Sequence, residues 1–245
     1  MMATDPECEL CGGLDWVLDC DEQGREVRQR CSACATRRPV PGVPKRYEAA
    51  SWANWEDVAE VRDLVDQIRA WRGGADLWCV LLHAESRSNL GAGKTRILVT
   101  LCRDWRDRGE SAHYLPVDQL FGAERERMSG LREYGDVHTL EWAKRFPGLL
   151  ALDDVGQEHD DKAGWAAGVL EELVDARYSA VLPLIAATNL DLDGLRVRYP
   201  RLWSRLHQGL LCPWIAPDFR RRPRSSAGPV HTTRQRGAGS RREEN

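Results

Sequence analysis

Apolar residues recur at helical spacing just upstream of the central part of the chain. Between residues 56 and 71 they fall three or four positions apart, at Val58, Val61, Leu64, Val65, Ile68 and Trp71. Such spacing places them on one side of a helix, and the Gly73-Gly74 pair that follows is a typical helix end. We therefore expect an amphipathic helix over residues 56–71.

Four short apolar runs follow, and most of them precede a stretch with helical character. The runs cover residues 77–82, 113–117, 149–152 and 181–187, and the helix-like stretches cover residues 97–106, 166–178 and 192–199. Buried strands that alternate with helices are typical of a parallel sheet covered on both faces. We expect an α/β domain over residues 47–219.

The segments that flank this domain have different compositions. Residues 1–37 contain few large aliphatic side chains, which favours a module held together by a metal over one with its own hydrophobic core. Residues 38–46 carry Pro39, Pro41 and Pro44, and proline restricts both itself and the residue before it, so we expect an extended linker. Residues 220–245 have almost no apolar content and are expected to be disordered.

Two C-x-x-C pairs stand in the N-terminal segment, nineteen residues apart, at Cys8, Cys11, Cys31 and Cys34. Each pair presents two sulfurs from one turn, and two turns complete the tetrahedron that Zn²⁺ prefers, so we predict a four-thiolate zinc module. Loose reduced thiols or a redox pair are the alternatives, and Cys20 is a candidate substitute ligand. The remaining cysteines lie in apolar stretches and are expected to be buried packing residues: Cys79, Cys102 and Cys212.

The overall composition is that of an ordinary globular protein, with 42% hydrophobic and 30% charged residues among 245. No apolar run approaches the roughly 20 residues that span a bilayer, and the N-terminus lacks the pattern of a secretory signal. We therefore expect a cytoplasmic protein with reduced cysteines and no membrane partner. The net charge of −3 gives no reason to expect nucleic acid, although residues 220–245 hold eight arginines against two glutamates. That tail either is simply solvated or binds nucleic acid by counterion release.

A phosphate-binding motif follows the first apolar run and opens the next helix, in the order Ser88, Asn89, Leu90, Gly91, Ala92, Gly93, Lys94, Thr95. Glycines let backbone N–H groups point at phosphate oxygens, and the helix N-terminus adds positive charge. Lys94 is expected to reach the β- and γ-phosphates of ATP, and the Thr95 hydroxyl to ligate Mg²⁺. Ser88 stands where the usual pattern has glycine, and a side chain there costs about 1–2 kcal/mol if φ is positive. A glycine turn that merely caps a helix is the alternative.

Polar residues end two of the later apolar runs. Asp153 and Asp154 follow the third run, and ligands of open α/β sheets bind at the carboxyl ends of strands. We expect Asp153 to hold Mg²⁺, directly or through water, and Asp154 to orient and deprotonate the attacking water. Asn189 ends the fourth run, where its amide is expected to contact the γ-phosphate or the lytic water. Solvated turn residues are the alternative at all three positions.

Arg201 and Arg205 lie four residues apart on one face of an expected helix. Such a pair is either a solvated basic face or a source of an arginine for the ATP of a neighbouring subunit. The second interpretation would make one of these two arginines catalytic within a homo-oligomer.

Together these motifs resemble the DnaC/DnaI helicase-loader and IstB-like branch of the AAA+ ATPases over about residues 43–220. The resemblance rests on a lead-in motif at residues 43–52, the P-loop, the Asp-Asp segment at residues 152–156, the Arg-Tyr and Thr-Asn segments at residues 175–178 and 185–190, the arginine helix at residues 201–206, and the acidic-aromatic-Arg sequence at residues 218–220. Arg205 is the better match to the branch's arginine finger. The branch's sensor-2 lid is not evident.

The resemblance implies a P-loop NTPase (AAA+) fold and an ATP-driven replication accessory that places a replicative DNA helicase on single-stranded DNA. Residues 121–134 fall where this branch often carries an extra DNA-contacting helix, with Arg125, Arg127 and Arg132 facing phosphates; a solvated helix is equally compatible. Two other functions remain open. One is an IstB-like transposition ATPase on double-stranded DNA; the other is a zinc-containing adaptor that does not hydrolyse ATP.

Overall fold

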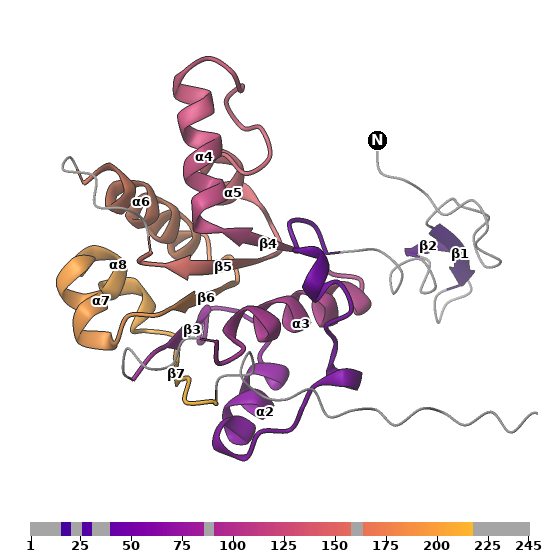
Figure 1. Cartoon of the computed structure of the whole chain (residues 1–245). Coiled ribbons are helices and arrows are strands. Elements are labelled where there is room, and N and C mark those ends of the chain that lie inside the picture. Colours follow the sequence, from indigo (N-terminus) through magenta and orange to yellow (C-terminus); the bar gives the residue numbers. More distant parts are fainter. Residues whose placement is uncertain (1–15, 21–25, 31–39, 86–90, 158–163, 218–245) are drawn as a thin grey trace, which may run out of the picture.

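Five parallel strands form the central sheet of the protein, in the spatial order β4-β5-β6-β3-β7. The structure is a computed structural model that describes residues 16–20, 26–30, 40–85, 91–157 and 164–217 (Figure 1). The strands are β3 (Cys79–His83), β4 (Ala112–Pro116), β5 (Leu149–Val155), β6 (Leu184–Thr188) and β7 (Leu210–Pro213). The predicted α/β fold with a parallel sheet is confirmed.

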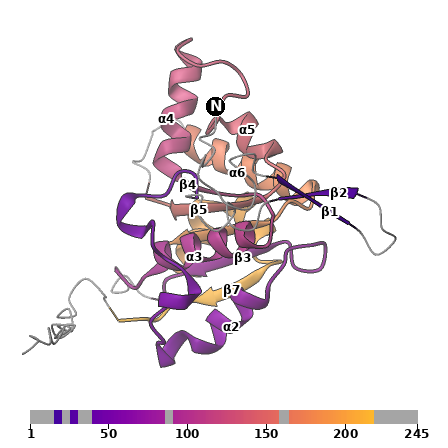
Figure 2. The same ribbon diagram turned by 90° about the vertical axis from the view of Figure 1, so that its right-hand side faces the viewer.

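Helices cover both faces of this sheet (Figure 2). One face carries α2 (Arg62–Ala70) and α3 (Lys94–Asp107). The other carries α4 (Val117–Met128), α5 (Leu140–Arg145), α6 (Trp165–Ser179), α7 (Leu192–Arg198) and α8 (Pro200–Leu206). Successive strand residues alternate between the two cores, as a strand requires: Val80 and Leu82 pack with α2 and α3, whereas Cys79 and Leu81 pack with the other helices.

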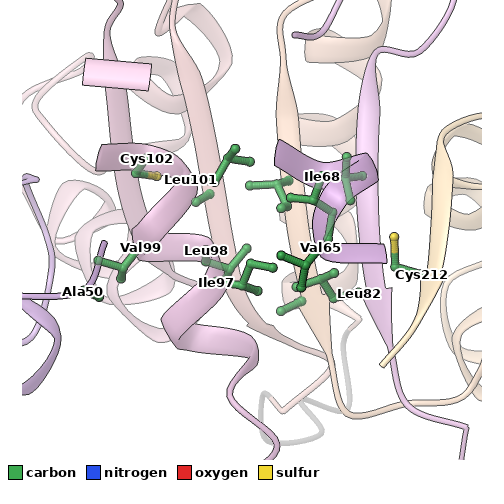
Figure 3. Packing of buried hydrophobic residues seen from close by; sticks show 14 of the residues in the cluster. Ala50, Val65, Ile68, Leu82, Ile97, Leu98, Val99, Leu101, Cys102 and Cys212 are labelled. Carbon is green, nitrogen blue, oxygen red and sulfur yellow. The ribbon is translucent and has the colours of Figure 1, made fainter. Parts of the chain in front are cut away.

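The core between α2, α3 and the sheet supports the N-terminal part of α3. Val65 and Ile68 of α2 lie toward Ile97 and Leu98 of α3, with Leu82 of β3 beside them (Figure 3). Burying side chains of this size stabilises a fold by about 1.5–3 kcal/mol each. The first turn of α3 is therefore held on a rigid support.

One predicted helix begins later than expected, and two short elements were not predicted. The helix expected over residues 56–71 begins as a 3-10 turn, η3 (Ala59–Val61), and becomes α-helical only in α2. The strand β7 and the helix α5 were not predicted, because both are short and lack a clear hydrophobic period.

The lead-in segment, residues 40–55, packs along the sheet edge and contains the 3-10 turns η1 (Lys45–Tyr47) and η2 (Trp52–Asn54). Its first residues belong to the expected extended linker, yet Val40 is buried and the Tyr114 N–H donates to the Pro41 carbonyl over 3.2 Å. Gly42 has φ +82, and a Cβ there would lie 2.0 Å from the Tyr114 carbonyl oxygen. Glycine therefore permits this close approach to β4.

The N-terminal segment contains an antiparallel hairpin of β1 (Trp16–Cys20) and β2 (Glu26–Arg30). The four predicted zinc ligands, Cys8, Cys11, Cys31 and Cys34, lie outside the described residues. The expectation for the other three thiols is confirmed, since all of them are buried: Cys79, Cys102 and Cys212. Within the described ranges, no helix has the length and apolar character that a bilayer span requires.

Candidate nucleotide-binding site

A cavity of about 550 Å³ lies where the carboxyl ends of β5 and β6 face the N-terminus of α3. The P-loop residues Gly91 to Thr95 form one wall, and the lead-in segment forms another through Arg46, Tyr47 and Trp55. Three of the predicted site residues also line it: Asp153, Asp154 and Asn189. Ser88, Asn89 and Leu90 lie outside the described residues, so the effect of Ser88 stays a prediction.

The P-loop has the backbone that its glycines predict. Gly91 has φ +83 and Gly93 has φ +86, a region that favours glycine. The chain enters α3 directly at Lys94, a residue that is only 8% exposed. Burial lowers the pKa of Lys94, and the carboxylates of Asp153 and Asp154 act in the opposite direction. A buried ammonium beside the partly exposed Gly91 and Gly93 is a suitable cradle for a phosphate chain.

Asp153 is held by three hydrogen-bond donors and is only 3% exposed. The Thr95 hydroxyl donates to its Oδ2 over 2.7 Å, and the Tyr114 phenol donates to the same oxygen over 2.6 Å. The Asp154 N–H donates to Oδ1 over 3.0 Å. A hydroxyl and a carboxylate at this separation are hard oxygen ligands of the type that Mg²⁺ uses beside a nucleotide, so the residues present fit that ion.

Asp154 lies at an irregular point of the sheet, where the β5–β6 register shifts between Leu152 and Val155. Its φ is +61, a conformation that costs a residue with a side chain about 1–2 kcal/mol. Its Oδ1 accepts hydrogen bonds from Gln157 Nε2 at 3.1 Å and from Asn189 Nδ2 at 3.4 Å. The strained backbone and these bonds aim the exposed carboxylate into the cavity.

Tyr114 and Gln157 were not singled out from the sequence. Tyr114 belongs to an apolar strand run, where an aromatic residue indicates core packing, and no spacing rule reveals that its hydroxyl meets Asp153. Burial raises the pKa of Tyr114, and the neighbouring Asp153 carboxylate raises it further. The phenol is therefore a hydrogen-bond donor throughout the physiological pH range.

Three tryptophans extend from the cavity wall into the protein. Trp55 lines the cavity, with Trp52 at 5.9 Å and Trp214 at 6.5 Å between ring centres, both edge-on. The buried Trp214 donates its Nε1 hydrogen to the Ala92 carbonyl over 2.7 Å. The chain just after β7 thus supports the P-loop backbone from beneath.

The structure does not bring Arg205 to this cavity. Arg205 lies on α8, where its Nε donates to Asp175 Oδ1 over 2.8 Å. Its guanidinium carbon lies 4.7 Å from the centre of the Tyr178 ring. Arg201, the other candidate, is exposed on the same helix. Any contact of Arg205 with a nucleotide would have to involve a neighbouring subunit.

No protein-family model matches this sequence, and no curated protein sequence matches it. Several solved structures resemble it in fold. One is DnaI, with 20% identity and a TM-score of 0.56, covering 72% of this chain and 97% of that one. Another is the DnaC helicase loader, with 18% identity and a TM-score of 0.51, covering 70% and 100% of the two chains.

A third is the replication initiator DnaA bound to AMPPCP and single-stranded DNA. It has 20% identity and a TM-score of 0.55, and the match covers 72% of this chain but 52% of that one. At these identities the likeness establishes a shared fold. The chain therefore has the P-loop α/β architecture of these replication proteins.

Proposed function

We propose that this chain is a Mg²⁺-dependent ATPase of the AAA+ class that loads a replicative DNA helicase onto single-stranded DNA. The observation that carries the ATPase part is the 2.7 Å hydrogen bond from Thr95 to Asp153, in the same cavity as Lys94 and Asp154. In this proposal the cavity would combine a phosphate cradle, a metal position and a base. The loader part is supported by the sequence resemblance and by the fold shared with DnaI and the DnaC helicase loader.

In this proposal each residue of the site has a separate role in ATP hydrolysis. The P-loop amides and Lys94 bind the β- and γ-phosphates, and Thr95 and Asp153 would hold Mg²⁺, which neutralises phosphate charge. Asp154 orients a water molecule and takes its proton as the oxygen attacks the γ-phosphorus. The bond from that phosphorus to the bridging oxygen breaks, and ADP leaves with the electron pair. Asn189 orients Asp154 through their hydrogen bond and contacts the γ-phosphate side.

The parts outside this cavity have roles in assembly. Arg205 would reach the ATP of a neighbouring subunit, which makes the active form a homo-oligomer that assembles with ATP. Residues 1–37 would form a zinc module that docks the helicase, followed by the linker at 38–46, the ATPase domain at 47–219 and the tail at 220–245. The chain would act in the cytoplasm.

Nucleotide binding tests the first step of the proposal. Lys94→Ala removes the charged donor to the phosphates and should weaken binding of a fluorescent ATP analogue by about 100-fold or more. Lys144→Ala is the matched control, because Lys144 binds Glu172 and Glu141 and does not line the cavity. Unchanged affinity in Lys94→Ala would refute the site.

Measurements of ATP turnover and of helicase binding test the remaining steps. Asp154→Asn should retain ATP binding and lose turnover by about 100-fold or more, as expected for a general base. Equal, measurable turnover would contradict the role of Asp154, and ATP binding without turnover in the unchanged protein would favour the adaptor that does not hydrolyse ATP. Purified replicative helicase should be retained by the immobilised full chain with ATP; retention of a transposase in its place would support the IstB-like alternative.

A further inference from the structure

We infer that Tyr114 is a positioning residue for the metal-binding carboxylate, because its phenol fixes Asp153 in the orientation that Asp153 needs to share a magnesium ion with Thr95. The inference rests on the proposed Mg-nucleotide function and deepens it. It assigns to the site a residue from a strand, β4, that contributes nothing else to the metal position.

The register of β4 and β5 brings the phenol to the carboxylate. Tyr114 pairs with Ala151, and Asp153 lies two residues further along β5, on the same face of the sheet. Tyr114 and Ala151 belong to the same buried core. The hydroxyl reaches Asp153 Oδ2 at 2.6 Å.

The Tyr114 backbone is fixed on its other side by the lead-in segment. Its N–H donates to Pro41, and its carbonyl lies against Gly42 at a distance that excludes any side chain there. The Tyr114 side chain is buried, with 3% of the residue exposed. The strand position from which the Tyr114 ring extends is therefore fixed by residues 40–44.

Two donors on one carboxylate oxygen define an orientation that a single donor does not. Thr95 and Tyr114 approach Oδ2 from α3 and β4, so rotation of the Asp153 carboxylate would break both bonds. Groups that hydrogen-bond to a metal ligand commonly change metal affinity 10- to 100-fold when they are removed. If the hydrogen bond served only to stabilise the fold, the result would differ. A buried phenol needs a hydrogen-bond partner, so removal of the phenol would lower stability but leave the dependence of nucleotide affinity on magnesium unchanged.

Tyr114→Phe tests the assignment, because it keeps the ring and removes the donor. The readout is the affinity for a fluorescent ADP, measured in EDTA and then across a magnesium titration. We expect unchanged affinity in EDTA, where the P-loop amides and Lys94 act alone. We expect the magnesium concentration that gives half of the metal-dependent gain in affinity to rise about tenfold.

Tyr134→Phe is the matched control. The Tyr134 phenol also hydrogen-bonds to a carboxylate, that of Glu141, but Tyr134 is exposed and does not line the cavity. The Tyr134→Phe variant should reach half of its metal-dependent gain in affinity at the same magnesium concentration as the unchanged protein.

The outcomes separate this inference from the proposed function. If the unchanged protein gains no affinity from magnesium, the proposed function fails. If it does gain affinity and Tyr114→Phe titrates identically, only the role of Tyr114 is overturned. Loss of binding in EDTA by Tyr114→Phe, with thermal unfolding unchanged, would also overturn it, because the residue would then act on the nucleotide itself.

Discussion

Arg205 donates its Nε hydrogen to the Asp175 carboxylate over 2.8 Å while its guanidinium lies across the Tyr178 ring. Within one subunit this arginine is therefore engaged on the surface of α6 and α8. Both members of the ion pair are exposed, and such pairs contribute only about 0–1 kcal/mol. Release of Arg205 toward a neighbouring nucleotide would meet little resistance.

Arg205→Ala should bind ATP normally and lose assembly-dependent turnover by about 1000-fold, as expected for an arginine supplied in trans. Mixing tests the subunit boundary directly. Lys94→Ala subunits retain the arginine and Arg205→Ala subunits retain the phosphate cradle, so a mixture should recover part of the turnover. No recovery, or an equal loss in Arg201→Ala, would contradict the assignment to Arg205.

Among the charged residues of the described fold, Arg177 should be the one whose replacement lowers the free energy of unfolding most. It is 0% exposed, and its guanidinium donates to four backbone carbonyls, those of Ala143, Phe146, Gly148 and Pro183, at 2.8–2.9 Å. Burial lowers the pKa of Arg177 to about 9. Arg177→Met should reduce the free energy of unfolding by about 3–5 kcal/mol, because several buried carbonyls lose their donors.

Urea unfolding measures this loss, with Arg145→Met as the comparison. Arg145 lies on α5 and its side chain is largely exposed beside Glu141, so its replacement should change stability by less than about 1 kcal/mol. Similar losses of unfolding free energy in both variants would show that the hydrogen bonds of Arg177 to the four carbonyls add no particular stability.

The stability of the domain should fall in mild acid through His113. Its Nε2 lies 2.9 Å from Nε2 of His138, an arrangement that requires one ring to donate and the other to accept. Burial, followed by His138 and Arg106, lowers the pKa of His113 to about 4. Between pH 6.5 and 4 the unfolded chain binds more protons than the folded one, so stability decreases as pH falls through this window.

The expected loss from this residue is about 2 kcal/mol between pH 7.5 and pH 5. Urea unfolding at both pH values should show a smaller difference for His113→Gln than for the unchanged protein. His207→Gln serves as the control, because this exposed histidine lies at the end of α8 and its Nδ1 contacts the Trp203 carbonyl, one turn earlier. An identical pH dependence in all three proteins would rule out the buried pair as the cause.

Elemental analysis should find one zinc per chain, bound through the four N-terminal cysteines. Cys8→Ser should lower the zinc content, because four-thiolate sites lose affinity sharply when one ligand is replaced. Cys102→Ala should leave it unchanged, since that thiol is buried in the domain core. A metal-free protein with a protease-resistant N-terminal segment would contradict the module.

The proximity of Thr95 and Asp153 could be predicted from the sequence, because parallel strands all end at the same edge of a sheet. A glycine-rich turn and a strand-end carboxylate are therefore brought together by topology alone. Most strands could be located for a similar reason, since buried parallel strands leave continuous apolar runs. The strand β7 lacks this signal: it is a short edge strand that ends at Pro213.

Tyr114 and Arg177 show why other features could not be anticipated. Their polar atoms find partners that are distant in the sequence, a carboxylate on β5 for Tyr114 and carbonyls of α5 and of the segment between α5 and β5 for Arg177. Periodicity shows that a residue faces inward, but it carries no information about which polar group it meets there. The apolar spacing of α6 places position 177 on its inward face, but an arginine is normally expected at the surface, and Arg177 is buried completely.

The tryptophan cluster at the cavity wall gives the molecule a built-in optical reporter. Indole rings 5.9 and 6.5 Å apart exchange excitation energy, so light absorbed by Trp52 or Trp214 also samples the surroundings of Trp55. An occupant beside Trp55 changes the polarity around one member and thereby the emission of all three. Occupancy of the cavity by unlabelled ligands can thus be followed in the unmodified chain.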